Sequence, residues 1–290
     1  MTKKEFAEWA AKETILMDGA TGTLLFKAGM PHDGSTELWV MEHPEVVQKI
    51  QKEYAEAGSR IVYACTFGAN RYSLKKHGLS DRVEELNRRL VEISKEGVDG
   101  LAYVAGDMTM TGEMLEPFGD MTEEELYDIY HQQAAVLIDS GVDLIGIETM
   151  LSLDEIKVAL RAIQDINDDL PVICTMTVTA SGKTIYGSDI YEAMQELQEM
   201  GASAVGVNCS PGPNELEEVI RGLKKVAKIS VIAKPNAGMP TVDAKGNSTY
   251  SMGAEEFAGY MKKLLDAGAG MVGGCCGTTP DYIRELKKIL

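Results

Sequence analysis

The chain alternates strand-like and helix-like segments along its whole length, and this pattern limits the folds open to it. Eight runs of strand length are apolar at successive positions, as expected when both faces of a parallel sheet are covered. These runs are 15–18, 60–65, 101–106, 143–148, 171–177, 203–208, 230–235 and 270–274. A segment with helical periodicity lies in each gap between them: 44–58, 81–97, 122–141, 152–166, 189–201, 214–228 and 254–268. Eight such units predict a (β/α)8 barrel of the TIM type.

The organisation of these units favours one domain over residues 1–290. Several helical segments end in glycine, the residue that most often follows a helix: Gly58, Gly141, Gly201 and Gly268. No Pro- or Ser-rich linker and no low-complexity tract divides the chain. Its 290 residues suit a barrel, which typically has about 250. An open, doubly wound sheet is the alternative; it uses fewer strands and does not need the last strand to close on the first.

Acids, amides and thiols gather where the predicted strands end. In a barrel of this kind, the active site lies at the carboxyl ends of the strands. The residues at that edge are Asp18, Gly19, Ala20, Thr21, Cys65, Thr66, Phe67, Gly106, Asp107, Glu148, Thr149, Asn208, Cys209, Asn236, Cys275 and Cys276. The loops at the opposite edge carry no such concentration. The sequence therefore predicts that these side chains share one site.

Three of the cysteines directly follow predicted strands. Cys209 follows the sixth strand, and the adjacent pair Cys275 and Cys276 follows the eighth. Flanking glycines let the backbone turn tightly enough for adjacent cysteines to face one ion. Zinc binds thiolates strongly, and three protein ligands with an open fourth position mark a catalytic site. We therefore expect these cysteines to hold one Zn²⁺, with the open position suited to a substrate thiol that the metal deprotonates.

Other interpretations of the cysteines remain open from the pattern alone, because their spacing fits no zinc-finger motif. The three could be buried small residues, or Cys275 and Cys276 could be a redox-active pair. Cys174 lies inside a predicted strand and is expected to pack in the core. Cys65 is expected either in the core or near the site.

Charge and hydropathy exclude several classes of partner. The formal net charge of −17 should repel nucleic acid and anionic membranes. The apolar stretches are far shorter than the roughly 20 residues of a membrane-spanning helix, and the charged first residues lack the features of a signal peptide. We therefore expect no nucleic-acid partner, no membrane partner and a cytoplasmic location. In that compartment, the five cysteines favour metal binding or catalysis over disulfides.

Six motifs are spread along the chain: MDGATGTLL (17–25), ACTFGANRYSL (64–74), GVDLIGIETM (141–150), GVNCSPGP (206–213), KPNAGMP (234–240) and GGCCGTTP (273–280). Together they resemble the homocysteine S-methyltransferase family. Within that family, they most resemble the homocysteine-binding module of cobalamin-dependent methionine synthase. The resemblance covers essentially the whole chain. Full methionine synthases carry further folate, cobalamin and activation domains. The chain is therefore expected to be a free-standing relative or an excised module.

The resemblance implies which residues hold the metal. Cys209, Cys275 and Cys276 match the zinc ligands of the family. Asn236 matches a position that can approach the metal before the substrate arrives, as a tentative fourth ligand.

The resemblance also implies a pocket for the amino-acid end of homocysteine. Asp18 and Glu148 match acids that hold its ammonium, and the amides of Gly19 and Ala20 would receive its carboxylate. The chemistry agrees, because an ammonium needs anionic partners and a carboxylate needs N–H donors. By pattern alone, Asp18 and Gly19 could form a plain turn, whereas a carboxylate after an apolar strand, as at Glu148, needs a partner. Asp107 is either a site residue or a loop cap.

The implied activity is zinc-dependent methylation of L-homocysteine, activated as a thiolate, to L-methionine. The implied donor is methylcobalamin, carried by a separate corrinoid protein that docks over the carboxyl face of the barrel. S-methylmethionine or betaine is the alternative donor, and an aromatic cage would favour it. Aromatic residues make up 6% of the chain, and Trp39 and Phe67 are the candidates for such a cage. A zinc-thiol binding or sensor protein is the alternative without catalysis; it would lack the amino-acid pocket.

Overall fold

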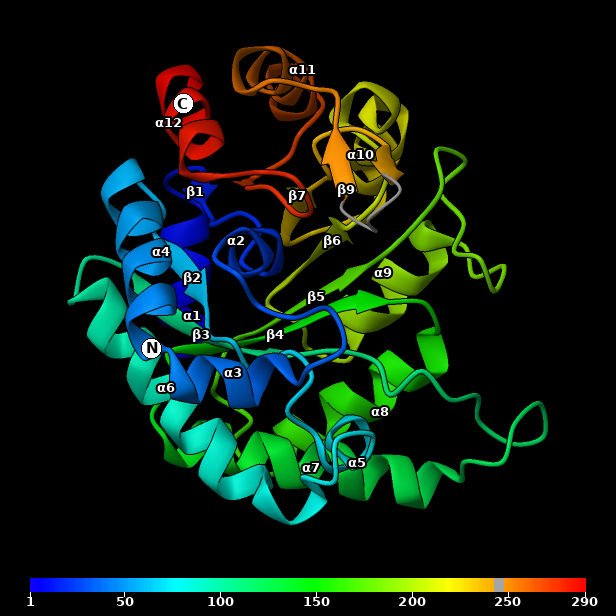
Figure 1. Cartoon of the computed structure of the whole chain (residues 1–290). Helices are drawn as coiled ribbons and strands as arrows, with labels where there is room; N and C mark the ends of the chain where they lie inside the picture. The colour runs from blue at the N-terminus through cyan, green and yellow to red at the C-terminus, as the bar shows by residue number, and fades with distance from the viewer. Residues whose placement is uncertain (243–247) are drawn as a thin grey trace.

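Eight parallel strands form the centre of the molecule (Figure 1). The computed structural model describes residues 1–242 and 248–290. The strands of this sheet are β1 (Ile15–Leu16), β2 (Ile61–Tyr63), β3 (Tyr103–Met108), β4 (Leu144–Met150), β5 (Val172–Met176), β6 (Ala204–Asn208), β7 (Ser230–Lys234) and β10 (Met271–Val272). Each overlaps one of the eight predicted runs, so the predicted strands are confirmed.

The sheet closes into a barrel. Its strand order is β1-β10-β7-β6-β5-β4-β3-β2, with parallel neighbours throughout. The two end strands also meet, because Met17 directly after β1 bridges Ile61 of β2, and the Arg60 amide donates to the Leu16 carbonyl oxygen at 2.7 Å. This contact confirms the (β/α)8 barrel and excludes the open, doubly wound sheet.

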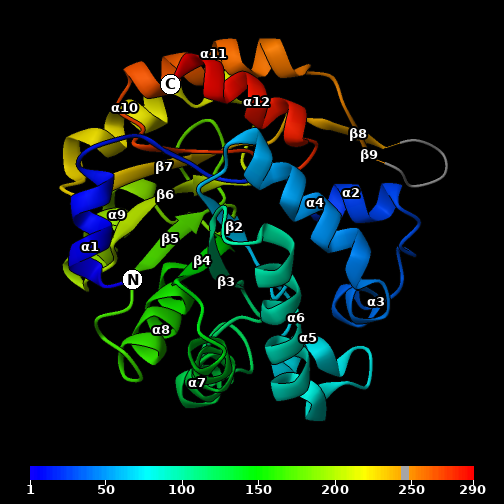
Figure 2. The ribbon, with the colours of Figure 1, turned by 90° about the vertical axis from the view of Figure 1, so that its left-hand side faces the viewer.

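Helices surround the barrel (Figures 1 and 2). They are α1 (Lys3–Ala10), α2 (Gly22–Lys27), α3 (Thr36–Glu42), α4 (Pro44–Ala57), α5 (Arg71–Lys75), α6 (Val83–Val98), α7 (Glu123–Asp139), α8 (Leu153–Gln164), α9 (Ile190–Glu199), α10 (Glu217–Val226), α11 (Ala254–Asp266) and α12 (Pro280–Ile289). The N-cap residues that precede α7, α8 and α9 are Thr122, Ser152 and Asp189, and their side chains accept hydrogen bonds from amides of the first turn. The glycines predicted to end helices all have positive φ, as that role requires.

Two apolar layers stabilise this arrangement. The outer layer packs the strands against the surrounding helices. The inner layer fills the barrel with side chains from alternate strand positions: Ile15, Met17, Ile61, Tyr63, Ala105, Leu144, Ile173, Ala204, Ile232 and Met271. Phe6 of α1 is fully buried in this inner layer, so α1 covers one end of the barrel. The carboxyl ends of the strands are left for the site.

Long loops follow the carboxyl ends of β3 and β5, toward the right in Figure 1. A hairpin of β8 (Pro240–Val242) and β9 (Ser248–Tyr250) follows β7; the sequence pattern does not indicate this hairpin. Among the described residues, every helix is too short or too polar to cross a lipid bilayer.

Candidate active site

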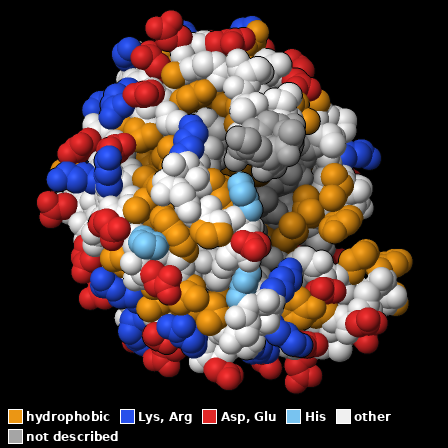
Figure 3. Space-filling view, in the orientation of Figure 1, with side chains coloured by type: hydrophobic (Ala, Val, Ile, Leu, Met, Phe, Trp, Pro, Cys, Tyr) orange, Lys and Arg blue, Asp and Glu red, His pale blue; other side chains and the backbone are white. Residues whose placement is uncertain are grey.

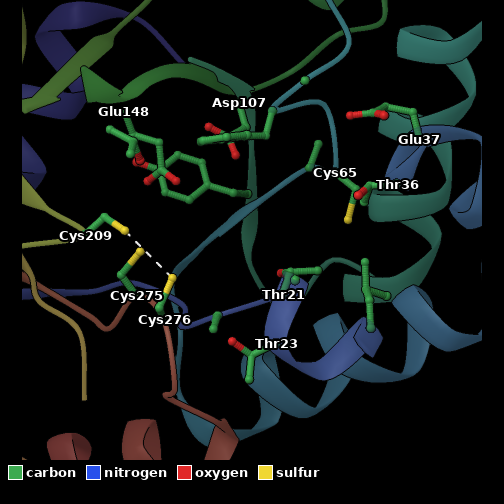
Figure 4. A pocket seen from close by; sticks show the side chains of 18 of the residues that line it. Thr21, Thr23, Thr36, Glu37, Cys65, Asp107, Glu148, Cys209, Cys275 and Cys276 are labelled. Carbon is green, nitrogen blue, oxygen red and sulfur yellow. Dashed lines mark hydrogen bonds between the residues drawn. The ribbon is translucent and has the colours of Figure 1, made fainter. Parts of the chain in front are cut away.

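A cavity of about 470 Å³ opens where the strands end (Figure 4). It is lined from the ends of β1, β2, β3, β4, β6, β7 and β10, and by residues of α2, α3 and α5. The sequence-predicted residues that line it are Asp18, Gly19, Ala20, Thr21, Cys65, Phe67, Asp107, Glu148, Thr149, Cys209, Cys275 and Cys276. The barrel therefore brings together most of the side chains that the strand-end rule selects.

The side chains of three cysteines converge at one point of this cavity. The Sγ atoms of Cys209, Cys275 and Cys276 all lie within 4.8 Å of one another, and those of Cys209 and Cys276 are 3.7 Å apart (Figure 4). A tetrahedral site with Zn–S bonds of about 2.3 Å has sulfur–sulfur edges of about 3.8 Å. The spacing of these thiols therefore fits a zinc ion. Within residues 1–242 and 248–290, no other cluster of His, Cys, Asp or Glu has this arrangement.

The three thiols perturb each other's ionisation. Hydrogen bonds with Cys209 and Cys275 lower the pKa of Cys276 to about 3. Hydrogen bonds with Cys209 and Cys276 raise the pKa of Cys275 well above its usual range. The cluster thus holds one thiolate readily and resists further ionisation, because the negative charges repel one another. A divalent cation removes this repulsion and stabilises all three thiolates.

Asn208, the last residue of β6, braces the strand ends that carry predicted site residues. Its fully buried side chain accepts hydrogen bonds from the Thr149 amide and from Thr175 Oγ1, both at 2.8 Å. It donates to Thr149 Oγ1, also at 2.8 Å. Thr149 and Cys209 have positive φ angles, 62° and 46°, which non-glycine residues rarely adopt. Such backbone strain persists where surrounding contacts hold it, and here it lies next to Glu148.

Three buried carboxylates line the same cavity: Asp18, Asp107 and Glu148 are 1%, 6% and 8% exposed. Asp18 Oδ2 accepts from the Tyr63 amide at 2.8 Å, and its Oδ1 accepts from Lys234 Nζ at 2.9 Å. In contrast, Asp107 Oδ1 and Glu148 Oε2 accept no hydrogen bond from the described residues. Asp107 therefore faces the cavity and does not cap a loop. Burial raises the pKa of Glu148 to about 7, and burial together with the Glu148 charge raises the pKa of Asp107.

Lys234 is a residue of this site that the sequence analysis missed. It ends β7, its side chain is 3% exposed, and its Nζ lies 3.8 Å from Glu148 Oε2 and 3.9 Å from the centroid of the Tyr63 ring. Burial alone lowers the pKa of this lysine, but the carboxylates of Asp18 and Glu148 raise it above its ordinary value. The alternation of side chains along β7 could have identified it. Ile232 points into the barrel, so Lys234, two positions later, points the same way.

The two amides predicted to receive a carboxylate, in the turn after β1, differ in this structure. The Ala20 amide donates to Thr278 Oγ1 at 3.1 Å. The Gly19 amide has no acceptor among the described residues. Asn236 lies beside one predicted ligand, since its Oδ1 accepts from the Cys276 amide at 3.1 Å.

The remaining candidates lie apart from the three thiols. Cys174 is fully buried within β5, as predicted for a packing residue. Cys65 lines the cavity but is not part of the cysteine cluster. Phe67 also lines the cavity, whereas Trp39 packs on His43, with ring centroids 4.5 Å apart, and does not line it.

The sequence is similar to those of two methionine synthases. The chain is 33% identical to methionine synthase from Mycobacterium leprae and to methionine synthase from Mycobacterium tuberculosis. The matches cover 97% and 95% of this chain, and 25% and 24% of those proteins. The chain thus spans about a quarter of the length of these relatives.

Solved structures and a family model complete the comparison. The homocysteine methyltransferase MmuM from Escherichia coli, in its metallated form, superposes with a TM-score of 0.80 over 97% of this chain and 98% of that one. Its sequence identity of 20% makes this a likeness of fold alone. The family model described as homocysteine S-methyltransferase matches residues 15–290. The chain therefore belongs to the homocysteine S-methyltransferase family.

Proposed function

We propose that this protein methylates L-homocysteine to L-methionine and that one zinc ion activates the substrate thiol. The observation that carries the proposal is the convergence of Cys209, Cys275 and Cys276 at spacings that suit zinc. Membership of the homocysteine S-methyltransferase family supports the same reaction class. The similarity to methionine synthases supports L-methionine as the product.

The three cysteines are proposed to hold the zinc and to leave its fourth position to the substrate sulfur. Zinc, when bound, lowers the pKa of a thiol in that position and so provides a nucleophile at neutral pH. The chain's own part is to keep the ligands in place. Asn208 braces the strand end before Cys209, and Asn236 holds the amide of Cys276. Because Asn236 lies beside this ligand, it is the candidate for the fourth position before substrate arrives.

Recognition of homocysteine is proposed to rest on its amino-acid end. Glu148 has a buried carboxylate oxygen that accepts no hydrogen bond from the described residues, so it is suited to receive the ammonium. The Gly19 amide, which has no acceptor among the described residues, is suited to receive the carboxylate. Holding both groups places the sulfur for in-line attack on the methyl carbon of the donor. Bringing two reactants together in this way accounts for much of the rate in such reactions.

A methylcorrinoid on a separate protein or module is the proposed methyl donor. The similarity to methionine synthases supports this choice. The cavity also offers little aromatic surface for a sulfonium or trimethylammonium donor. Among its described lining residues, Tyr63 supplies a phenol ring and Phe67 a phenyl ring, and the Tyr63 ring already contacts Lys234.

Exposed apolar side chains on the loops of the carboxyl face support a macromolecular donor (Figure 3). They follow β3, β5 and β7, and five of them define what we call the apolar rim: Met114, Phe118, Ile185, Tyr186 and Met239, which are 44%, 83%, 70%, 53% and 63% exposed. Contiguous exposed apolar patches mark interaction surfaces, and we propose that the apolar side chains of these loops together form one. A docking protein that carries the methyl group fits this face.

Two alternatives remain distinguishable by experiment. A small donor such as S-methylmethionine or betaine would need no docking protein. A zinc-thiol sensor would need no amino-acid pocket, and the buried carboxylates beside the cysteines argue against it.

The decisive test is methyl transfer to L-homocysteine by the zinc-loaded protein, with methylcobalamin, S-methylmethionine and betaine compared as donors. We expect methionine to form together with loss of the methylcobalamin spectrum, and neither to occur in a Cys209→Ser variant. Methionine formed from a small donor alone would favour the alternative enzyme. Homocysteine binding that does not depend on zinc would contradict the proposed role of the cysteines.

A further inference from the structure

Lys234 and Asp18 form a buried ion pair within the pocket proposed for the amino-acid end of homocysteine. Their charged atoms are 2.9 Å apart, and the two side chains are 3% and 1% exposed. The second oxygen of Asp18 accepts from the Tyr63 amide. Because both carboxylate oxygens of Asp18 already accept hydrogen bonds and its side chain is almost fully buried, little of its carboxylate is accessible to a ligand.

Two other carboxylates of the cavity, unlike that of Asp18, each have an oxygen that accepts no hydrogen bond from the described residues. These oxygens, Asp107 Oδ1 and Glu148 Oε2, are buried. Buried carboxylate oxygens are normally paired, because removing them from water is costly. Lys234 Nζ lies 3.8 Å from Glu148 Oε2, beyond hydrogen-bonding distance. It is the buried lysine among the described lining residues, so Glu148 shares this cation with Asp18 through a longer ion pair, and Asp107 has none.

The inner layer of the barrel is built around this lysine. Gly273 of the neighbouring strand end has no side chain, and a Cβ placed there would lie 2.6 Å from the Asp18 carbonyl oxygen and 3.3 Å from Lys234 Cγ. A Cβ at Gly146 would collide with the ring of Tyr63, which the Lys234 ammonium contacts. Glycine at position 146 leaves room for the Tyr63 ring, and glycine at position 273 lets the backbone of Asp18 lie close beside Lys234. The pairing of Lys234 with Asp18 is therefore determined by the packing of the barrel interior.

We propose that the ion pair with Lys234 keeps the Asp18 carboxylate from contacting the substrate. The homocysteine ammonium is then received jointly by Glu148 and Asp107. This inference rests on the proposed function. It replaces the role that the family resemblance implies for Asp18, which becomes a positioning residue for Lys234. The raised pKa values of Asp107 and Glu148 are consistent with it, since the pocket without substrate holds more negative charge than one lysine balances.

The test compares two thiols that bind to the zinc-loaded protein. One is L-homocysteine; the other is 4-mercaptobutanoate, which has the same thiol, chain and carboxylate but no ammonium. Calorimetry gives a dissociation constant for each. Their ratio isolates the contribution of the ammonium, and binding of 4-mercaptobutanoate shows that a variant is folded and holds its metal.

Asp107→Asn should weaken homocysteine binding by about tenfold or more and change 4-mercaptobutanoate binding little, because one charge-assisted hydrogen bond is lost. Asp18→Asn should also weaken homocysteine binding, because Lys234 then pairs with Glu148 and competes with the substrate. Adding Lys234→Met to Asp18→Asn should restore the affinity.

Two results would overturn the proposal. One is an unchanged ratio in Asp107→Asn. The other is a failure of Lys234→Met to restore homocysteine binding in the Asp18→Asn background, which is the result expected if Asp18 itself holds the ammonium. Loss of zinc-dependent binding of both thiols by the unsubstituted protein would instead contradict the proposed function.

Discussion

Asn208 and Thr149 are joined by two hydrogen bonds between strands that are not neighbours in the barrel. The Asn208 side chain accepts from the Thr149 amide and donates to the Thr149 hydroxyl, each at 2.8 Å. Asn208 ends β6 and precedes Cys209, whereas Thr149 lies in β4 and follows Glu148. The contact thus links the position of a proposed metal ligand to that of a proposed ammonium acceptor.

Replacing Asn208 should therefore affect both stability and binding. Asn208→Ala should lower the free energy of unfolding by about 2–3 kcal/mol, because it leaves the buried hydroxyl of Thr175 and the polar groups of the half-buried Thr149 without their partner. It should also weaken homocysteine binding, since Thr149 loses the contacts that hold its positive φ next to Glu148. Denaturant unfolding and calorimetry measure the two effects.

Thr175→Val is the matched control for Asn208→Ala. It removes one hydrogen bond to Asn208 but leaves both contacts with Thr149 in place. It should lower stability by about 1 kcal/mol and keep the homocysteine dissociation constant. If Asn208→Ala also left the homocysteine dissociation constant unchanged, the hydrogen bonds between Asn208 and Thr149 would contribute to stability alone and not to binding.

Removing one proposed ligand should remove the metal. Cys209→Ser should lose bound zinc on dialysis and with it methyl transfer, because two thiolates do not complete a catalytic zinc site. Cys174→Ala is the control, since Cys174 is buried in β5 outside the cluster; it should retain about one zinc per chain. Metal analysis and the methyl-transfer assay together decide the point. Stoichiometric zinc with full activity in Cys209→Ser would refute the site.

Removing the charge of Glu148 should mainly weaken substrate binding. Glu148→Gln keeps the size of the side chain, and it should raise the homocysteine dissociation constant by about tenfold or more, since hydrogen bonds to charged groups contribute about 1.5–3 kcal/mol. Zinc content should stay at the level of the unsubstituted protein. An unchanged dissociation constant would remove Glu148 from the pocket.

The raised pKa of Glu148 predicts a pH dependence. Below its value of about 7, this carboxyl is protonated in the free protein and cannot attract an ammonium, so homocysteine binding should weaken as the pH falls through 7. Because the folded value lies above the ordinary value of 4.5, the stability that this group contributes is present below 4.5 and is lost as the pH rises to about 7. Titration of binding against pH checks the first statement. The change below pH 7 should be reduced in Glu148→Gln.

Charges placed in the apolar rim should impair the docking of a donor protein. Phe118→Asp and Ile185→Asp alter side chains that are 83% and 70% exposed, so folding, zinc content and homocysteine binding should be retained. Methyl transfer from a protein-bound corrinoid should fall, whereas transfer from free methylcobalamin should not. Leu101→Asp is the control, because Leu101 is 54% exposed but precedes β3 at the other end of the barrel. Equal rates in all three variants would contradict docking at this face.

Local pattern determined the elements of this fold. Apolar runs and helical periodicity are properties of short segments, and they predicted the eight strands and the helices between them. The rule that barrel sites lie at strand ends then selected Glu148, Cys209 and Cys275. The motif resemblance supplied the family, which the match over residues 15–290 confirms.

Only the closed barrel decided which of these side chains pair. Lys234 and Asp18 are 216 positions apart, and the Ala20 amide finds its acceptor in Thr278, 258 positions away. Such contacts depend on the register between strands and on the direction of each side chain, which no local pattern contains. The sequence by itself therefore determined the barrel, its active edge and the candidate zinc ligands. The tertiary structure decided that Asp18 is already paired with Lys234, because that pairing arises when distant strands close into one barrel.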